Sequence, residues 1–294
     1  MKVFAGIVTY NPDISGLEQN LRAILPQVEK TIVFDNGSSE VDKITRSIET
    51  IAGSSRACLI AHGRNAGMAK ALNRICEEAL KCGVSHVLFL DQDTIACDGL
   101  VEGLLGNMHE DVGIASPRIV DRNDVEEESY TGVTEELSRA ITAGSLVNLH
   151  AWRAVGGYDE GLFVDWVDYE FCDNLRVRSY RIVRVNTVTV LHELGKKEFK
   201  GVGWTFSWSR GFYRAPIYRN ERSLVRRYDL MRGHGYATYK YKKTSVWREE
   251  AWLTVVDILH NLMYEKKRLQ FVKAAAQGFI DGRRAAKDGI RLKG

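Results

Sequence analysis

The chain has 294 residues, of which 45% are hydrophobic and 27% are charged, a composition that is ordinary for a globular protein. It contains no run of about 18 apolar residues, which argues against a membrane-spanning helix. The formal net charge of +3 combines two unlike parts: residues 1–194 contain 18 Lys and Arg against 29 Asp and Glu, whereas residues 195–294 contain 23 against 9.

Short apolar runs alternate with amphipathic stretches along the first hundred residues. Strands are predicted at Val3–Thr9, Thr31–Phe34, Ala57–Ala61 and His86–Leu90, and helices at Ile14–Val28, Val41–Ala52 and Asn65–Cys82. Strands that alternate with helices predict βαβ units and a mixed, mainly parallel sheet with flanking helices.

The rest of the chain has a less regular pattern. Further strands are predicted at Val112–Ser116, Ile141–Leu149 and Ile182–Leu191, with an acidic surface loop over Asp121–Glu136. Basic helices are predicted at Pro216–Met231, Thr244–Tyr264 and Lys266–Lys287. The basic excess of this last part predicts an anionic partner, either nucleic acid or an anionic membrane surface.

Five cysteines are spread along the chain without metal-site or disulfide-framework spacing. The N-terminal apolar run is too short for an export signal and is predicted to be a strand instead. We therefore expect free thiols and a cytoplasmic location, at most peripheral to the inner face of the plasma membrane.

Polar residues follow three of the predicted strands at the point where each strand ends. These residues are Asn11, Asp35 and Asp91. In an open α/β sheet, ligands bind beyond the carboxyl ends of the strands. The three positions therefore predict one shared binding crevice.

Asp91-Gln92-Asp93 is the most informative of these segments. It follows the apolar run Val87–Leu90, so both carboxylates lie at the end of a buried strand. Carboxylate oxygens are the ligands that Mg²⁺ and Mn²⁺ prefer, commonly shared with substrate phosphates. In isolation, such a short motif is more often a surface turn, and its context decides between the two interpretations.

A second acidic cluster and one histidine are further candidates. Asp165, Asp168 and Glu170 alternate with aromatic and apolar residues, and partial burial raises the pKa of a carboxylate toward that of a base. The alternative for Glu170 is the acidic first turn of a helix. His192 follows a Val-rich run and is either a turn residue or a metal ligand.

Six motifs in order resemble the inverting family 2 glycosyltransferases, which have the Rossmann-like GT-A fold. They are Val8–Asn11, Phe34–Ser38, Asn65–Gly67, Leu90–Asp93, Gly156–Glu160 and Asp168–Glu170. The Asp-Gln-Asp-Thr sequence and the stretch Phe163–Cys172 are most similar to the rhamnosyltransferase branch. The resemblance covers roughly residues 1–225, and no motif is recognised beyond residue 235.

The resemblance implies a role for each matching residue. Thr9 and Tyr10 would flank the nucleobase and Asp35 would hold it, while Asn65, Gly67 and Lys70 would line the nucleotide side of the cleft. Asp91 would contact the ribose or a metal-bound water, and Asn11 and Gln92 complete the donor-binding set. Asp93 would bind the metal, Mn²⁺ or Mg²⁺, with His192 as a further ligand. Asp168 would be the general base, although Val167 replaces an acid of the wider family and leaves Asp165 as the alternative base.

The expected enzyme is thus a metal-dependent glycosyltransferase with a catalytic domain at residues 1–235 and a basic helical extension at 236–294. The branch resemblance implies dTDP-L-rhamnose as the donor and a polysaccharide or polyprenyl-linked glycan as the acceptor, with peripheral membrane contact through the basic helices. A UDP-hexose or UDP-galactofuranose donor remains open. Two other classes are alternatives: a sugar nucleotidyltransferase, whose Gly-rich loop after the first strand is missing here, and a non-catalytic nucleic-acid-binding protein.

Overall fold

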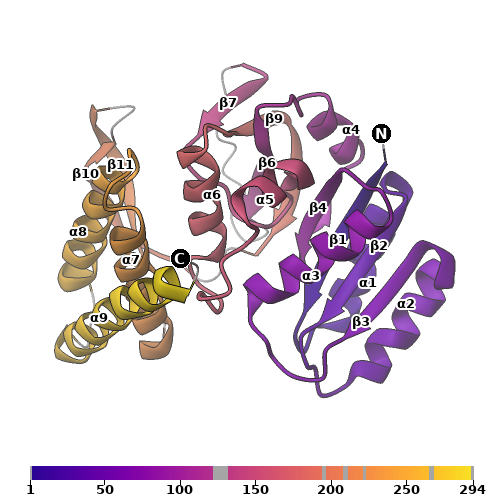
Figure 1. The fold of residues 1–294 in the computed structure, drawn as a ribbon, viewed down its shortest axis with the longest axis horizontal. Coiled ribbons are helices and arrows are strands. Elements are labelled where there is room, and N and C mark those ends of the chain that lie inside the picture. The colour runs from indigo at the N-terminus through magenta and orange to yellow at the C-terminus, as the bar shows by residue number, and fades with distance from the viewer. Residues whose placement is uncertain are drawn as a thin grey trace. The chain divides into compact units, whose positions relative to one another are not determined.

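The structure, a computed structural model, describes residues 2–121, 132–193, 197–207, 211–220, 223–264 and 268–292. The chain forms two compact units, Met1–Glu193 and Leu194–Gly294, and each is described by itself (Figure 1). The division does not coincide with the expected catalytic boundary at residue 235, which lies inside a helix of the second unit. That boundary stays a prediction about function.

The first unit is built on one mixed sheet. Its strands are β1 (Val3–Thr9), β2 (Lys30–Asp35), β3 (Ala57–Ala61), β4 (His86–Asp91), β5 (Ile95–Ala96), β6 (Val112–Asp121), β7 (Thr134–Leu137), β8 (Leu146–Asn148) and β9 (Arg181–His192). They run in the order β3-β2-β1-β4-β8-β6-β9-β5, and β7 pairs with β9. The β3-β2-β1-β4 block and the β6–β9 pair are parallel, whereas β8, β5 and β7 pair antiparallel to their neighbours. The predicted mixed, mainly parallel sheet is confirmed.

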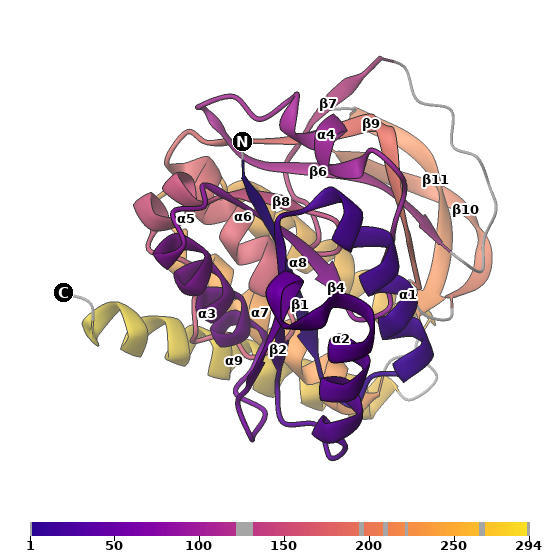
Figure 2. The ribbon, with the colours of Figure 1, turned by 90° about the vertical axis from the view of Figure 1, so that its right-hand side faces the viewer.

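Helices cover both faces of this sheet. They are α1 (Ile14–Ile24), α2 (Val41–Arg56), α3 (Met68–Lys81), α4 (Leu100–Leu105), α5 (Leu149–Val155) and α6 (Val167–Val177), with a 3₁₀ turn at Leu25–Gln27. In Figure 2, α3, α5 and α6 lie to the left of the central strands and α1 lies to the right. The alternation within β1 explains this, because Val3, Ala5 and Ile7 join the core under α1, α2 and α4.

The opposite face of the sheet is packed closely by aromatic rings and by α3. A Cβ built on Gly6 of β1 would lie 2.7 Å from Cγ2 of Ile75, so only glycine lets α3 approach this closely. The ring centroids of Phe89 and Tyr158 are 6.0 Å apart, and those of Tyr158 and Phe171 are 4.1 Å apart. These contacts connect β4 to α6 and fix α6 against the sheet.

Two predictions in the first unit need correction. The expected strand at Ile141–Leu149 contains only the short β8, because pairing with β4 and β6 involves just residues 146–148. Within the expected loop 121–136, Asp121 ends β6 and residues 134–136 belong to β7, where backbone pairing with β9 outweighs their acidic character. Residues 122–131 of that prediction lie outside the described residues.

Over its described residues, the second unit consists of a β-hairpin and three long helices. Its elements are β10 (Lys197–Ser207), β11 (Gly211–Asn220), α7 (Leu224–Lys240), α8 (Trp247–Tyr264) and α9 (Arg268–Leu292). The helix predicted at Pro216–Met231 is wrong over residues 216–220, since these residues pair with β10. The helix predicted at Thr244–Tyr264 is present from Trp247, and the helix predicted at Lys266–Lys287 is present from Arg268. Residues 221, 222, 266 and 267 of these predictions lie outside the described residues. Along the described ranges, no helix has the length and apolar content needed to cross a bilayer.

Glycines allow α7 and α9 to cross with their backbones in contact. A Cβ on Gly282 would lie 2.0 Å from the carbonyl oxygen of Arg232 and 2.8 Å from the amide nitrogen of Tyr236. Gly235 and Gly278 face similarly close backbone atoms, at 2.1 Å and 2.3 Å. Because the obstructing atoms are backbone, no side-chain rotation relieves the overlap.

We therefore expect Gly282→Ala to destabilise the second unit by about 3 kcal/mol, through overpacking of the helix crossing. Gly289→Ala is the matched control on the same helix, because its Cβ would meet only the Tyr236 hydroxyl at 3.8 Å. That control should be neutral or more stable by about 0.5–1 kcal/mol, since alanine favours the helix. Hydrogen exchange of the α7 amides measures both effects, and equal protection in the two variants would contradict the close crossing.

Candidate active site

The carboxyl ends of the parallel strands meet at one edge of the sheet. β1 ends at Thr9, β2 at Asp35, β4 at Asp91 and β9 at His192. Thr9 pairs with Asp35 in the β1–β2 register, and the β1–β4 register ends at Asp91. β9 points the same way as β4, because β8 is antiparallel to both β4 and β6 and β6 is parallel to β9. The polar residues after these strands lie at a single edge, as their sequence positions predict.

The loops after β1 and β2 are interlocked around the Asp35 carboxylate. Asp35 is 1% exposed, and its Oδ1 accepts hydrogen bonds from the hydroxyls of Thr9 and Ser38. Its Oδ2 accepts from the backbone N–H groups of Gly37 and Ser38 at 3.1 Å and 2.9 Å. Asn11 joins the same network, because its backbone N–H donates a hydrogen bond to the Ser38 hydroxyl at 2.8 Å. With four donors already around it, Asp35 shapes this loop, and its contact with a nucleobase stays a prediction.

A second asparagine network orders the loop before α3. Asn65 Oδ1 accepts from Asn36 Nδ2 and from the Gly67 amide, each at 3.0 Å. Gly67 has a φ of 88° and lies so close to Phe163 that a Cβ would sit 2.8 Å from the Phe163 carbonyl oxygen. That carbonyl accepts from the Met68 amide at 2.6 Å. The predicted nucleotide-side residues are thereby tied to the segment that leads to Asp168.

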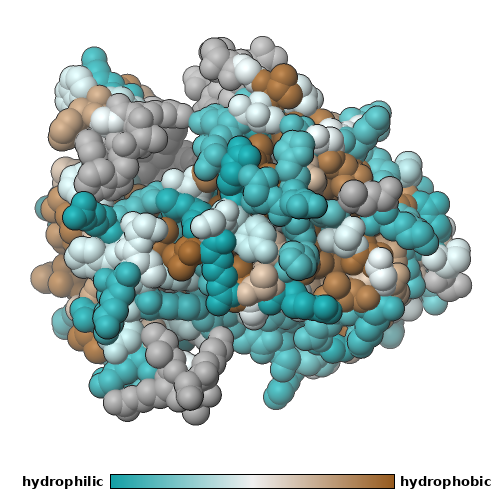
Figure 3. All heavy atoms as spheres, turned by 45° about the horizontal axis from the view of Figure 1, so that its top comes forward, coloured by the Kyte–Doolittle hydropathy of each residue, from teal (hydrophilic) through white to brown (hydrophobic). Residues whose placement is uncertain are grey.

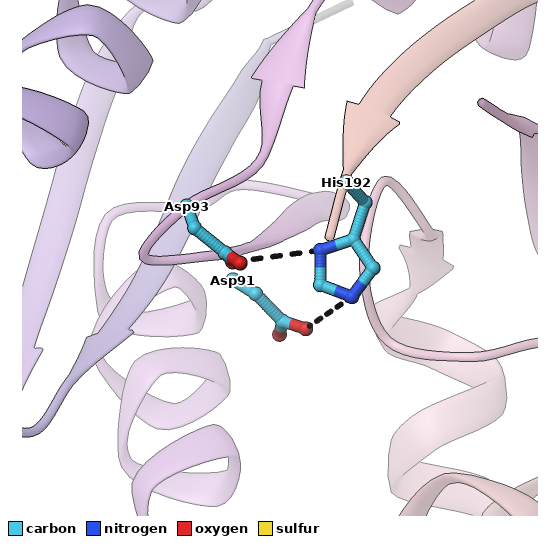
Figure 4. Close-up of side chains that lie close together, drawn as sticks. All are labelled: Asp91, Asp93 and His192. Atoms are coloured by element: carbon cyan, nitrogen blue, oxygen red, sulfur yellow. Dashed lines mark ion pairs between the residues drawn. The ribbon is translucent and has the colours of Figure 1, made fainter. Parts of the chain in front are cut away.

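Asp91, Asp93 and His192 form a compact cluster at the sheet edge (Figure 4). One ligand atom from each lies within 4.8 Å of the others. Asp91 Oδ2 lies 3.6 Å from Nε2 of His192, and Asp93 Oδ1 lies 3.4 Å from its Nδ1. The imidazole therefore faces both carboxylates, although 99 residues separate His192 from Asp93.

The charges within this cluster perturb one another. Burial raises the pKa of Asp91, the positive charge of His192 opposes the rise, and the negative charge of Asp93 adds to it. Burial by itself lowers the pKa of His192, but the nearby carboxylates of Asp93 and Asp91 raise it above its ordinary value. Asp121, the register partner of His192 in β6, acts in the same direction.

This donor set fits a divalent cation. Two carboxylate oxygens and one imidazole nitrogen are ligands that Mn²⁺ accepts, and Mg²⁺ accepts the carboxylates. The N···O separations of 3.4 Å and 3.6 Å are longer than common hydrogen bonds, so the imidazole is not tightly hydrogen-bonded to either carboxylate. All three are half-buried, which leaves the cluster open to a ligand that carries phosphate.

Neighbouring residues hold the cluster in place, and two of them, Asn20 and Thr94, were not among the candidate site residues of the sequence. Asn20 of α1 is fully buried and donates from Nδ2 to the Asp91 carbonyl at 2.8 Å. The buried Thr94 hydroxyl lies 3.3 Å from Nδ1 of His192. Gln92 Oε1 accepts from the Tyr10 amide at 3.0 Å, connecting the loops after β1 and β4. The one sign of the role of Asn20 in the sequence is that this polar residue lies between the apolar Leu17 and Leu21 of a predicted helix.

Asp168 lies in the first turn of α6, after a residue with a rare backbone conformation. Trp166 has a φ of 74°, which costs of order 1–3 kcal/mol for a bulky residue and marks many functional sites. Asp168 is half-buried, and its Oδ1 accepts from the Tyr169 amide at 2.8 Å. Asp165, the alternative base, lies half-buried in the preceding loop.

The pKa of Asp168 is raised to about 6, mainly by burial, and the negative charge of Asp91 raises it further. The Tyr169 amide opposes this rise. The carboxylate of Asp91, on β4, is thus near enough to Asp168, on α6, for its negative charge to act on it. A carboxylate with this pKa is a competent base near neutral pH.

Arg139 holds the segment around Asp168 through an ion pair and two aromatic contacts. It donates to both oxygens of the fully buried Asp173, at 3.2 Å and 2.8 Å. Its guanidinium also lies 5.3 Å from the ring centroid of Trp166 and 5.1 Å from that of Tyr169. Burial raises the pKa of Asp173 to about 6 even though the charge of Arg139 opposes it. This pair holds the aromatic residues on both sides of Asp168.

We expect Arg139→Met to destabilise the first unit by about 3 kcal/mol, because it leaves the Asp173 carboxylate buried without its bidentate partner. The double variant Arg139→Met/Asp173→Leu should recover most of this loss, since an apolar pair of similar volume commonly replaces a buried ion pair. Urea denaturation measures both. A double variant as unstable as the single would mean that stacking on Trp166 and Tyr169, and not the ion pair, carries the stability.

The remaining predicted site residues lie at the rim of the same edge. Tyr10 is 50% exposed, and Lys70 is half-buried in the first turn of α3. Exposed groups at such a rim are available to a ligand, and their contact with a donor stays a prediction.

Comparison with known sequences assigns the first part of the chain to a family. The model of the family described as glycosyl transferase family 2 matches residues 5–156, which is more than half of the chain. A curated relative, dTDP-rhamnosyl transferase RfbF of Shigella flexneri, is 27% identical over an alignment of 317 positions that covers 98% of each chain.

Solved structures with the same fold agree with this match. The mannosyltransferase PcManGT from Pyrobaculum calidifontis, in complex with GDP-Man and Mn²⁺, is 15% identical with a TM-score of 0.62, covering 99% of this chain and 80% of its own. S. aureus TarS 1–349, in complex with UDP-GlcNAc, is 14% identical with a TM-score of 0.63, covering 97% and 82%. The predicted GT-A fold is thus confirmed.

Proposed function

The chain belongs to glycosyl transferase family 2, and on this premise we propose that it is an inverting, metal-dependent glycosyltransferase that transfers L-rhamnose from dTDP-L-rhamnose. The acceptor would be a polysaccharide or a lipid-linked glycan in cell-surface polysaccharide synthesis. Membership of an enzyme family sets aside the alternative of a non-catalytic nucleic-acid-binding protein.

The observation that carries this proposal is a carboxylate with a raised pKa near a three-residue cluster that could hold a cation. Asp91, Asp93 and His192 lie within 4.8 Å of one another, and Asp168, with a pKa of about 6, is near enough for the charge of Asp91 to raise that pKa. Inverting transfer requires a base and a leaving-group stabiliser on opposite faces of the sugar. We propose that Asp168 is the base and that the three-residue cluster stabilises the leaving group.

The reaction is a direct displacement at the anomeric carbon. Asp168 takes the proton of the acceptor hydroxyl as its oxygen bonds to the anomeric carbon, while the bond from that carbon to the diphosphate oxygen breaks. The electron pair of the broken bond stays on the departing nucleoside diphosphate. A divalent cation held by Asp93 and His192 would supply positive charge to that diphosphate, and Asp91 would contact the ribose or a metal-bound water.

The choice of donor is supported by the full-length similarity to dTDP-rhamnosyl transferase RfbF. UDP-hexose and UDP-galactofuranose remain the alternative donors, because solved structures of the same fold are complexes with different nucleotide sugars. We propose that the nucleobase binds at the interlocked loops around Thr9 and Asp35, whose contacts would decide between thymine and uracil.

A lipid-linked acceptor would require the enzyme to work at a membrane. A lipid-linked acceptor at the inner face of the plasma membrane would call for peripheral attachment, and the basic second unit is suited to an anionic surface. A cytoplasmic location follows from the same argument and stays a prediction.

One screen tests the reaction. The protein is incubated with dTDP-L-rhamnose, UDP-glucose, UDP-galactofuranose and GDP-mannose, with Mn²⁺, with Mg²⁺ or with EDTA, and nucleoside diphosphate release is measured. We expect release from dTDP-L-rhamnose that stops with EDTA. Release that ignores EDTA would refute the metal role, and preference for a UDP-sugar would replace the proposed donor.

A further inference from the structure

The second unit contains a cavity that the proposed reaction does not use. It has a volume of about 580 Å³ and lies among the end of α7, the start of α8 and the later part of α9. This volume falls within the range of about 300–1,000 Å³ that is typical of small-molecule sites. Its lining is mainly apolar and includes Trp247, Val255 and Phe279.

Three cationic side chains, Lys242, Lys243 and Arg283, line the same cavity. Lys242 Nζ lies 4.3 Å from the ring centroid of Tyr239, and the Arg283 guanidinium lies 5.8 Å from that of Phe279. These two charged groups therefore lie over aromatic rings at the edge of the apolar cavity.

No carboxylate of the described residues lines this cavity, and none forms an ion pair with these three cations. The neighbouring Arg284 differs, since it pairs with Asp281 at 3.2 Å. Among the described residues, the positive charge at this cavity is thus not balanced by a carboxylate, which favours an anion.

An apolar stripe continues from the cavity along α8. Val255, Leu259 and Met263 are 47%, 54% and 59% exposed and are spaced four residues apart, so they share one face over about 12 Å of helix. Ile280, beside Phe279 on α9, is 52% exposed. In Figure 3, hydrophobic residues reach the surface at the left-hand edge, where α8 lies in Figure 1.

Cations beside an apolar cavity that opens on an apolar stripe match one ligand chemistry, a phosphate carried on a hydrocarbon chain. We propose that this cavity is a binding site for an anionic membrane lipid. The lipid phosphate contacts Lys242, Lys243 and Arg283, and its hydrocarbon chain contacts Trp247, Val255 and Phe279. The inference rests on the proposed function for its setting, an acceptor-bearing membrane. A nucleic-acid backbone would satisfy the charges but leave the apolar lining unused.

Vesicle sedimentation of the full-length protein tests the site with charge-matched variants. Vesicles contain phosphatidylcholine alone or with added phosphatidylglycerol. The double variant Lys242→Gln/Arg283→Gln is compared with Lys273→Gln/Arg284→Gln, which removes the same charge from exposed positions outside the cavity. We expect the first double to bind phosphatidylglycerol vesicles about 30-fold more weakly, from the loss of two cations near the surface. The control double should lose less than about threefold.

Ala251→Leu tests the apolar part without changing charge, because Ala251 also lines the cavity. The larger side chain should weaken vesicle binding about tenfold by excluding about two methylene groups of the lipid. If both double variants weakened vesicle binding equally, or if Ala251→Leu bound vesicles as the parent does, the proposed lipid site would be wrong. Competition by inorganic phosphate as strong as by short-chain phosphatidic acid would also overturn it, as would tighter retention on DNA than on vesicles.

Donor turnover in the nucleotide-sugar screen separates this inference from the proposed reaction. The cavity variants should release nucleoside diphosphate at the parent rate, because none of their residues belongs to the candidate active site. A parent protein that turns over a donor but ignores anionic vesicles would refute the lipid site alone. Vesicle binding that needs the cavity, without turnover of any donor, would refute the proposed reaction alone.

Discussion

Replacing Asp168 with asparagine is expected to lower the turnover number by about 10³-fold, while donor affinity changes by less than about threefold. Asparagine keeps the size of the side chain. Its oxygen can still accept the hydrogen bond that the Tyr169 backbone N–H donates to the carboxylate at 2.8 Å. It cannot take a proton from the acceptor. Steady-state transfer kinetics and calorimetric titration with the donor measure the two quantities.

Asp165→Asn is the matched control, because Asp165 lies half-buried three residues earlier. It should keep turnover within about tenfold of the parent rate, well short of the loss of a base. If Asp165→Asn abolished transfer and Asp168→Asn did not, the base would be Asp165. Loss of donor affinity in Asp168→Asn would instead mean that the variant had disturbed the loop at Phe163 that contacts Gly67.

The pH dependence of the parent enzyme should report the same carboxylate. The acceptor proton can move only to ionised Asp168, so kcat/KM should rise as the pH increases through the pKa of about 6 and level off above it. A bound divalent cation favours the charged carboxylate, so the rise should be centred at or below pH 6. A rise centred above pH 8 would point to a different titrating group.

Replacing Asp93 with asparagine should lower kcat/KM by about 10²-fold or more, because a cation ligand that acts on the leaving diphosphate is lost. The amide oxygen is a weaker ligand than a carboxylate for Mn²⁺ and Mg²⁺. Binding of Mn²⁺, followed by its electron paramagnetic resonance signal, should weaken in parallel.

Asp98→Asn serves as the control for Asp93, because Asp98 is exposed five residues further on and lies outside the cluster. It should bind Mn²⁺ and turn over the donor as the parent does. If Asp93→Asn bound Mn²⁺ with parent affinity but lost turnover, Asp93 would act on the substrate directly, and the cation would need other ligands.

Local patterns were sufficient where an element is defined by its own residues. The bounds predicted for β1 and β3 agree with the structure, because each is a short apolar run that ends at turn residues. The same reasoning was wrong over residues 216–220, where the pairing partner, β10, decides between strand and helix. A strand is stable only through hydrogen bonds to another segment, so its own residues do not specify it fully.

Some residues of the candidate site could likewise be identified from the sequence and others could not. Asp91 and Asp93 could be identified from the sequence, since a buried strand that ends in two carboxylates is unusual unless they bind something. Asn20 and Arg139 could not be singled out, because each acts through a partner distant in sequence: the Asp91 carbonyl for Asn20, and Asp173 for Arg139.

The amino-acid sequence by itself determined the fold class, the family and the residue types available for catalysis, because these depend on periodicity and on motifs that are local. Only the tertiary structure decided that His192 faces Asp91 and Asp93, that Asp168 is buried enough for a pKa of about 6, and that Lys242, Lys243 and Arg283 share an apolar cavity. Distances, burial and electrostatic fields depend on which segments pack together, and packing brings together residues that the chain keeps far apart.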